Sequence, residues 1–185
     1  MRFRRRAKEG MNESRQAFNV RQALEADAAA LLNIYRPFVE STAVTFETVV
    51  PTVEEFSSRI ARALSSYQWL VAERDGRCIG YAYGSIHRAR PAYRWSVEVS
   101  AYVHPDYHRQ GVGRALYRQL LNELAEKGFC NAYAATTLPN EGSVALHRGM
   151  GFEPIGVFKA VGRKFGKWHD VTWFHRVLRD SPLSE

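Results

Sequence analysis

The most constraining feature of the sequence is an uninterrupted series of a strand, a glycine-containing loop and a helix. WSVEVSAYV (95–103) alternates polar and apolar residues with the period of a half-buried strand. HPDYHRQGVGRAL (104–116) follows, and an amphipathic helical pattern runs from Gly113 to about Lys127. Gly128 is a typical helix terminator. The series predicts a sheet that carries a loop and a helix N-terminus at the end of one strand.

The loop is suited to binding a phosphate or a pyrophosphate. Backbone N–H groups at a helix start lack partners and carry partial positive charge, and Gly111 and Gly113 would let a ligand approach them. Arg109 and Arg114 would add charge. The P-loop sequence is absent, and the third glycine of a dinucleotide-binding loop is missing. A tight turn without a ligand explains the two glycines equally well, so the loop alone does not decide.

The remaining patterns place several helices around one sheet. LEADAAALLNIYRPFVEST (24–42) has a helical period, and Thr52 with Glu55 forms a capping-box start for a second helix. Asp75-Gly76 predicts the turn of a β-hairpin. Further strands are expected at 18–23, 131–138, 152–165 and 171–178, and a short helix at 140–150. This order predicts an α+β fold with a single central sheet.

Positive charge is concentrated at the N-terminus. The formal net charge is +7, and the first ten residues set a basic cluster against Glu9: Arg2, Arg4, Arg5, Arg6 and Lys8. Because the rest of the chain has an ordinary charge balance, we expect no nucleic-acid partner. The expected organisation is a basic, disordered tail over 1–16, a globular domain over 17–180 and a C-terminal tail over 181–185. No apolar run approaches the roughly 20 residues of a membrane helix, so no membrane partner is expected.

Cys78 and Cys130 are the only cysteines. Their spacing matches neither a redox pair nor a zinc site, so reduced thiols and no bound metal are expected. Reduced thiols favour a cytoplasmic location.

Several stretches together resemble the GNAT superfamily of N-acetyltransferases. Its pyrophosphate loop reads Gln/Arg-x-x-Gly-x-Gly/Ala between a strand and a helix, as residues 108–113 do except for His108 at the first position. The chain is most similar to the group of phosphinothricin and L-amino acid N-acyltransferases, from about Phe18 to Leu178. The matching stretches are NIYRPFVESTAVTFET, WLVAERDGRCIGYAYG, RARPAYRWSVEVSAYVHPDYHRQGVGRALY, LPNEGSVALHRGMGF and GRKFGKWHDVTWF. Of these, TAVTFE and KWHDV are specific to the group.

The resemblance implies a GNAT fold, in which a mixed and mostly antiparallel sheet has two splayed strands that form an acetyl-CoA cleft. The implied cofactor contacts are Ala101, Tyr102, Val103, Arg109, Gln110, Gly111, Val112, Gly113 and Arg114, with Asn140 and Ser143 on the short helix. Backbone amides would make most of the phosphate contacts, so His108 should not abolish binding. The N–H near Val103 would donate to the thioester carbonyl.

Two side chains are candidates for moving the proton of the amine. Glu98 shares a strand face with Ser96 and Ser100, and a charge on a central strand is costly unless that face meets solvent or a site. The resemblance places Glu98 in the acceptor pocket. His147 shares a helix face with Asn140, but a histidine there is equally well explained as a core residue. The sequence leaves open which of the two carries the proton.

The acceptor pocket implied by the resemblance combines arginine with aromatic side chains. Arginine suits a carboxylate or a phosphinate, and aromatic rings would form the walls. The candidate residues are Phe46, Arg88, Arg90, Tyr93 and Trp95. KWHDV (167–171) is expected to be a turn before the last strand, with Trp168 and His169 at the pocket rim and in a homodimer contact.

The sequence therefore predicts an N-acetyltransferase that transfers an acetyl group from acetyl-CoA to the α-amine of a small amino-acid-like acceptor. Phosphinothricin and methionine sulfoximine or sulfone are examples of such acceptors. One alternative is the same fold acting on a polyamine, an aminoglycoside or a peptide N-terminus, although Arg88 and Arg90 would repel polycations. Another alternative is a non-catalytic acyl-CoA-binding module.

Overall fold

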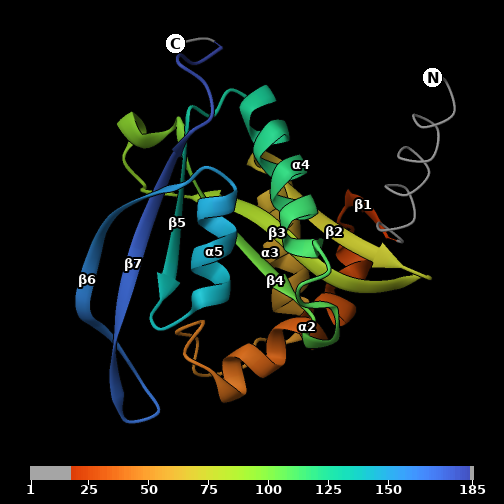
Figure 1. The fold of residues 1–185 in the computed structure, drawn as a ribbon. Helices are drawn as coiled ribbons and strands as arrows, with labels where there is room; N and C mark the ends of the chain where they lie inside the picture. The colour runs from red at the N-terminus through yellow and green to blue at the C-terminus, as the bar shows by residue number, and fades with distance from the viewer. Residues whose placement is uncertain (1–17, 184–185) are drawn as a thin grey trace, which may run out of the picture.

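A computed structural model describes residues 18–183, so the tail expected at 1–16 lies outside the described residues. Seven strands form one sheet in the order β1-β2-β3-β4-β5-β7-β6 (Figure 1). Neighbouring strands are antiparallel except β4 and β5, which run parallel. The predicted α+β fold with one mixed, mostly antiparallel sheet is confirmed.

The structure contains each helix and strand that the sequence predicts. The strands are β1 (Asn19–Gln22), β2 (Trp69–Arg74), β3 (Arg77–Ile86), β4 (Ser96–Val103), β5 (Asn131–Thr137), β6 (Glu153–Lys164) and β7 (Lys167–Val177). The helices are α2 (Ala28–Ser41), α3 (Val53–Ser66), α4 (Val112–Glu126) and α5 (Glu141–Gly149). Three short 3-10 helices are η1 (Glu25–Asp27), η2 (Pro91–Tyr93) and η3 (Pro105–Tyr107).

The helices cover both faces of the sheet. In Figure 1, α4 and α5 lie on the near side and α3 on the far side. Side chains of β2 alternate between two hydrophobic cores, one on each face of the sheet. Leu70 packs in the core beneath α4, while Trp69 and Val71 pack against α2 and α3. The apolar face of α4 is fully buried at Leu116 and Leu120. The predicted helical period thus corresponds to a real packing face.

Local sequence signals explain where several elements begin and turn. Thr52 Oγ1 accepts a hydrogen bond from the Glu55 N–H across 3.1 Å, and Glu55 Oε2 accepts one from the Thr52 N–H across 2.9 Å. This capping box starts α3 as predicted. The β2–β3 hairpin turns at Asp75 and Gly76, whose φ angles are 51° and 72°. Both residues occupy the left-handed region that a two-residue hairpin turn requires.

The last hairpin differs from the prediction. KWHDV (167–171) is not a turn, because β7 already begins at Lys167. The turn consists of Phe165 and Gly166 with φ angles of 51° and 75°, and pairing resumes at once between Lys164 and Lys167. The prediction was wrong because phenylalanine rarely adopts a left-handed φ, which hid the short turn.

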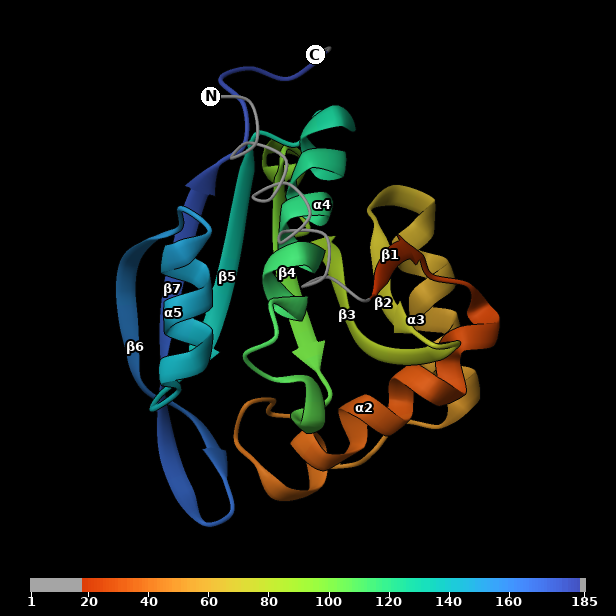
Figure 2. The same ribbon diagram turned by 45° about the vertical axis from the view of Figure 1, so that its right-hand side comes forward.

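The sheet opens between β4 and β5. These strands pair only at three positions, where Ser96–Glu98 lie beside Asn131–Tyr133. Beyond that point, β4 continues to Val103 and β5 to Thr137 without pairing, and Figure 2 shows the two strands diverging. The predicted splay is therefore present, and it divides the sheet into two halves joined at one end.

Candidate active site

Backbone groups of β4 face the splay. The His104 N–H donates to the Ile79 carbonyl across 2.9 Å, and such bonds alternate along an antiparallel pair. The backbone groups of Ala101 and Val103 therefore point away from β3, toward β5. His108 Nε2 donates to the Val103 carbonyl across 2.9 Å, which leaves the Val103 N–H directed into the splay.

The loop after β4 presents the start of α4. Gly111 is the N-cap residue with a φ of 84°, and no side chain within residues 18–183 caps this helix. The first-turn N–H groups, including those of Gly113 and Arg114, therefore point outward. Apart from Gly111 and its two chain neighbours, no described atom lies within 4 Å of a Cβ position at Gly111. The junction offers both the partial charge and the space that a pyrophosphate needs.

Two side chains of this loop are engaged within the loop itself. Gln110 donates to the Asp106 carbonyl across 2.9 Å and accepts from Arg74 across 3.1 Å. His108 binds the Val103 carbonyl, so the residue that departs from the superfamily pattern closes the loop. Arg109 is exposed and adopts a φ of 59°. Of the side chains predicted to contact the cofactor here, Arg109 is free to reach outward and Gln110 is held.

Helix α5 lies across the splay from the loop. Asn140 caps it, because the Asn140 Oδ1 accepts from the Ser143 N–H across 3.0 Å. Ser143 Oγ lies 2.9 Å from Thr136 Oγ1 on β5 and 3.3 Å from His147 Nδ1. The Asn140 cap thus stabilises the start of α5, and the Ser143 hydroxyl joins the helix to β5.

His147 is buried between α4, α5 and β7. Its Nδ1 lies 2.8 Å from the Ser143 carbonyl, which can only accept, so Nδ1 carries the proton. Nε2 then accepts from the Tyr117 hydroxyl across 3.1 Å, and the ring stacks on Phe174. Burial lowers the pKa of His147 to about 4, outweighing the opposite effect of the Ser143 carbonyl. The imidazole is therefore neutral at physiological pH, with both nitrogens already bonded.

Glu98 lies on the other face of β4, toward α2 and α3. Its side chain is 28% exposed, whereas the neighbouring Val97 and Val99 are buried. Glu98 Oε1 lies 3.0 Å from His87 Nδ1 and 3.7 Å from an Arg88 guanidinium nitrogen. Glu98, the charged residue of this central strand, therefore contacts an imidazole and a guanidinium.

Aromatic rings surround this polar group. The His87 ring stacks on Tyr133 with a centroid distance of 4.3 Å and an interplanar angle of 8°. Tyr93 and Trp173 meet the His87 ring edge to face at 5.9 and 6.2 Å. The Arg88 guanidinium lies over the Trp173 ring at 5.9 Å. A carboxylate, an imidazole and a guanidinium therefore share an aromatic-walled site beside the splay.

Residues 20–173 match the Acetyltransferase (GNAT) domain family. The chain belongs to the GNAT acetyltransferases. Phosphinothricin N-acetyltransferase of Streptomyces viridochromogenes is 38% identical over 166 residues, which cover 90% of this chain and 91% of that protein. An L-methionine sulfoximine/L-methionine sulfone acetyltransferase of Salmonella typhimurium is 36% identical over 160 residues, covering 86% and 94%. The predicted superfamily and acyltransferase class are confirmed.

The GNAT fold is also shared with solved structures. A phosphinothricin acetyltransferase of Sinorhizobium meliloti, solved in complex with acetyl-CoA, has a TM-score of 0.86 and 34% sequence identity to this chain. The match covers 91% of this chain and 92% of that one. The likeness extends over the whole GNAT domain and is not confined to its glycine loop.

Not every predicted acceptor residue of this GNAT acetyltransferase lies by Glu98. Arg88 and Tyr93 do, through the contacts given above. Trp95 lies instead beneath Arg94, at 4.8 Å, and Arg90 is exposed and makes no ion pair within residues 18–183. Phe46 packs on Gly162 and lies 6.2 Å from His169, at the β6–β7 hairpin. The roles predicted for Arg90, Trp95 and Phe46 remain predictions.

Sequence reasoning missed three residues of this site: His87, Tyr133 and Trp173. Tyr133 lies opposite Glu98 in the register of β4 and β5, but helix α4 connects those strands, and no short turn fixes their register in the sequence. The sequence signal that could have identified His87 is its position directly before Arg88, in the loop that was predicted to line the acceptor pocket.

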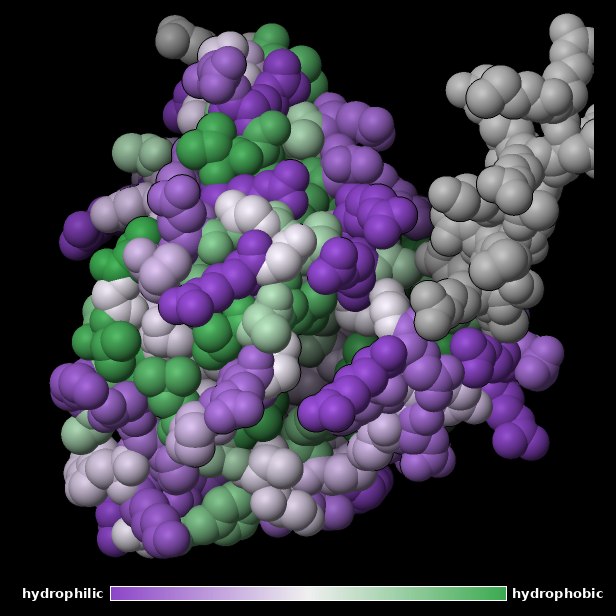
Figure 3. Space-filling model, in the orientation of Figure 1, coloured by the Kyte–Doolittle hydropathy of each residue, from purple (hydrophilic) through white to green (hydrophobic). Residues whose placement is uncertain are grey.

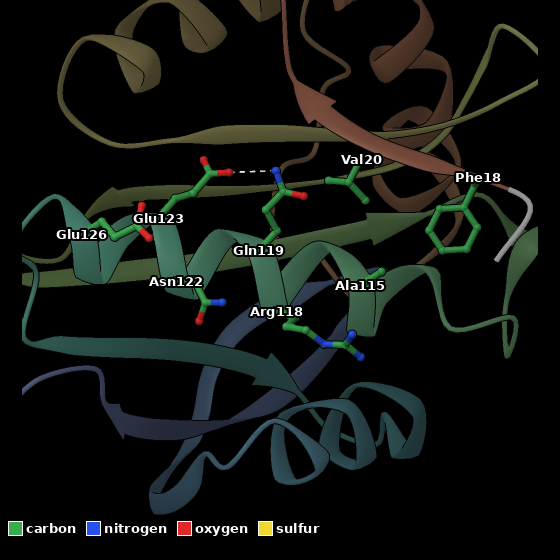
Figure 4. A pocket seen from close by; sticks show the side chains of 8 residues that line it. All are labelled: Phe18, Val20, Ala115, Arg118, Gln119, Asn122, Glu123 and Glu126. Atoms are coloured by element: carbon green, nitrogen blue, oxygen red, sulfur yellow. Dashed lines mark hydrogen bonds between the residues drawn. The ribbon is translucent and has the colours of Figure 1, made fainter. Parts of the chain in front are cut away.

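Two hollows accompany the site. A cavity of about 230 Å³ beneath α3 is lined by aromatic rings including Trp69 and Tyr83, and by Ser85, the cross-strand neighbour of Glu98. A larger open groove follows α4 on the side of β1 (Figure 4), where Arg118, Glu123 and Glu126 line it. The groove contains none of the predicted site residues and lies on the opposite side of α4 from α5.

Residues 18–183 contain no group of three or more His, Cys, Asp and Glu side chains arranged to hold a metal ion. In the same part of the chain, no helix has both the length and the apolar character needed to cross a membrane.

Proposed function

We propose that this GNAT acetyltransferase transfers the acetyl group of acetyl-CoA to the α-amine of a small amino-acid-like acceptor, with both substrates bound together. The observation that carries the proposal is the division of the β4–β5 splay. Unpartnered backbone groups lie at the β4 end and the α4 start, and the Glu98–Arg88 pair lies on the other face of β4. The names of the relatives, which acetylate phosphinothricin and methionine sulfoximine or sulfone, support this acceptor class.

The donor side suits coenzyme A through main-chain groups. The open N-terminus of α4 would hold the pyrophosphate, and the Val103 N–H would donate to the thioester carbonyl. Acetyl-CoA supplies an acetyl group on a sulfur leaving group when bound. Asn140 and Ser143, at the start of α5, would line the far side of the cleft, as the resemblance implies.

The acceptor side suits an α-amino acid, which carries an ammonium group beside a carboxylate. Glu98 would attract the ammonium, while Arg88 would pair with the carboxylate or phosphinate. Holding the amine next to the thioester in this way makes the reaction effectively unimolecular, which lowers the barrier by up to roughly 7–11 kcal/mol in favourable cases.

Glu98 is the better of the two candidates for governing removal of the ammonium proton. It is partly exposed beside the splay, on the face that also carries Arg88. His147 is 3% exposed, and its low pKa and two hydrogen bonds support a structural role.

Exposed apolar side chains of β6, which forms an edge of the sheet, support a homodimer as part of the proposal. Large apolar side chains are exposed along β6 and its turn, and Trp168 on β7 is 63% exposed. The exposed apolar residues of β6 and its turn are Ile155, Val157, Phe158, Val161 and Phe165. Figure 3 shows hydrophobic surface on the left, where Figure 1 places β6 and β7. A second copy would cover these side chains, because large apolar patches exposed to water usually mark an interface.

A cytoplasmic location is supported by the cysteines. Cys78 and Cys130 are both free thiols, and burial raises the pKa of the Cys78 thiol. A thiol with a raised pKa forms less thiolate and resists oxidation.

Release of free thiol from acetyl-CoA across a panel of amines tests the proposed reaction. Phosphinothricin, methionine sulfoximine and methionine sulfone should give the highest kcat/KM. Preference for spermidine, an aminoglycoside or a peptide N-terminus would move the acceptor to another class. Binding of acetyl-CoA without thiol release from any amine would instead indicate a non-catalytic binding module.

A further inference from the structure

The His87 ring is held in one orientation. Tyr133 stacks beneath it, Tyr93 and Trp173 meet it edge to face, and its side chain is only 11% exposed. Its Nδ1 lies 3.0 Å from Glu98 Oε1. A ring fixed by three aromatic neighbours and one carboxylate presents its second nitrogen in a defined direction.

The contact with Glu98 determines the tautomer of the neutral ring. An ionised carboxylate can only accept, so Nδ1 must carry the hydrogen of this bond. The lone pair then lies on Nε2, which has no hydrogen bond to another side chain or carbonyl within residues 18–183. In many enzymes, a carboxylate orients the imidazole of a histidine that acts as general base in this way.

We propose that Nε2 of His87 takes the proton from the acceptor ammonium and that Glu98 is the positioning residue that holds Nδ1–H. The inference rests on the proposed function. The ammonium N–H bond breaks with its electron pair left on nitrogen, and an N–H bond forms at Nε2. Imidazole is a stronger base than a carboxylate by about two pKa units, so it removes this proton more readily near neutral pH.

The other bonds and protons of the reaction are accounted for by the two substrates and water. A C–N bond to the acetyl carbon replaces the C–S bond of the thioester, and the second amine proton goes to the departing sulfur. His87 then returns its proton to water. Glu98 gives up no proton in this sequence, and its contact with Nδ1–H stabilises the imidazolium that forms.

Charged and aromatic side chains surround the His87 ring. Glu98 and Arg88 are the charged groups beside the ring, and Tyr133 and Tyr93 are its aromatic neighbours. His175 packs on the Tyr133 ring at 5.0 Å, but its Nε2 binds Asn131 Oδ1 across 2.8 Å. His175 therefore offers a matched control, since it shares the Tyr133 ring and lacks the Glu98 contact.

The kinetic experiment compares His87→Gln and His175→Gln with the wild type over about pH 5–9, with methionine sulfoximine as acceptor. His87→Gln should lower kcat about 100-fold, the range for loss of a general base. It should also remove the acidic limb of the pH profile and leave the Kd of acetyl-CoA unchanged. His175→Gln should retain the acidic limb. A kcat within about twofold of the wild type in His87→Gln, or an unchanged acidic limb, would overturn the proposal.

A second readout requires no turnover. Nitrogen-15 spectra of the imidazoles in the free protein should show the Nδ1–H tautomer for His87, and its titration midpoint should coincide with the acidic limb of kcat/KM. Glu98→Gln should shift both midpoints together to lower pH. The Nε2–H tautomer in the wild type would refute the assignment. If the wild type acetylates no amine, the proposed function fails instead, and the tautomer still reports on the His87–Glu98 pair.

Discussion

The Tyr117 hydroxyl donates to Nε2 of His147 across 3.1 Å, and this bond joins α4 to α5 beside the donor side of the splay. Both residues are almost fully buried. Protonation of Nε2 would reverse this bond and place a positive charge among buried groups, so the packing of the two helices favours a neutral imidazole.

Stability should therefore fall as His147 is forced to protonate. Its pKa is about 4 in the folded protein, against the ordinary histidine value of 6.5. Between these values the unfolded chain binds the extra proton, so stability present above about pH 6.5 is lost as the pH falls toward 4, by about 3 kcal/mol in total. Urea unfolding at about pH 7 and pH 4.5 measures the loss. His147→Gln should show a flatter dependence, and an equal slope in both proteins would contradict the prediction.

Glu98→Gln should lower kcat by more than about tenfold and leave the Kd of acetyl-CoA little changed. The amide can still contact His87, but it cannot stabilise the imidazolium or attract the ammonium. Glu73→Gln is the matched control, because Glu73 also lies on a strand and is similarly exposed, at 26%, but pairs with Arg21. Steady-state kinetics decide the matter: unchanged turnover in Glu98→Gln would remove Glu98 from the acceptor site.

Gly111→Ala should weaken acetyl-CoA binding by about tenfold. An alanine at a φ of 84° is strained by about 1–2 kcal/mol, so the loop would relax and redirect the first-turn N–H groups of α4. Gly166→Ala carries similar strain, at a φ of 75°, in the β6–β7 turn, and no atom lies within 4 Å of either Cβ position. Titration calorimetry should show weakened binding in the first variant only. Equal affinities would mean that the loop does not hold the donor.

Gly162→Ala should displace Phe46. A Cβ built at Gly162 would overlap the Phe46 ring, whereas one at Gly156 on the same strand meets nothing within 4 Å. If Phe46 lines the acceptor pocket, Gly162→Ala should raise the KM of the acceptor several-fold and lower Tm, while Gly156→Ala changes neither. A lower Tm with an unchanged KM would leave Phe46 as a packing residue only.

Trp168→Glu should dissociate the proposed homodimer. A carboxylate buried against a second copy without a partner costs several kcal/mol, enough to shift the equilibrium to monomer. Leu24→Glu introduces the same charge at a side chain that is 59% exposed elsewhere, and it should keep the dimer mass. Light scattering after size exclusion gives the masses. A wild type that is monomeric, or a dimer in all three proteins, would contradict the proposed interface.

The fold could be predicted because its helices and turns depend on sequence patterns that span only a few residues. The capping box at Thr52, the Asp75-Gly76 turn and the leucine face of α4 each depend on residues a few positions apart, so they can be recognised in one sequence. The connection expected over residues 165–170 was too long, because Phe165 adopts a conformation that its residue type seldom takes and so confines the turn to Phe165-Gly166.

The cluster around Glu98, the proposed acceptor site, was harder to predict because its parts meet only through tertiary structure. Glu98 stood out as a charge on a central strand, whereas Tyr133 reaches it by parallel pairing across α4, and Trp173 comes from β7. His147 shows the converse difficulty. Its helix face carries polar residues that suggest chemistry, yet those residues form caps and internal hydrogen bonds.

The short parallel pairing of β4 with β5 leaves two kinds of atoms on the two sides of one opening. At the end of β4 and the start of α4 they are main-chain amides, which are present whatever residues the chain carries there. Around Glu98 they are side-chain atoms, which change with every substitution. Under the proposed division of the site, replacements around Glu98 would change which amine is chosen and leave thioester binding intact, so a new specificity would arise without rebuilding the cleft.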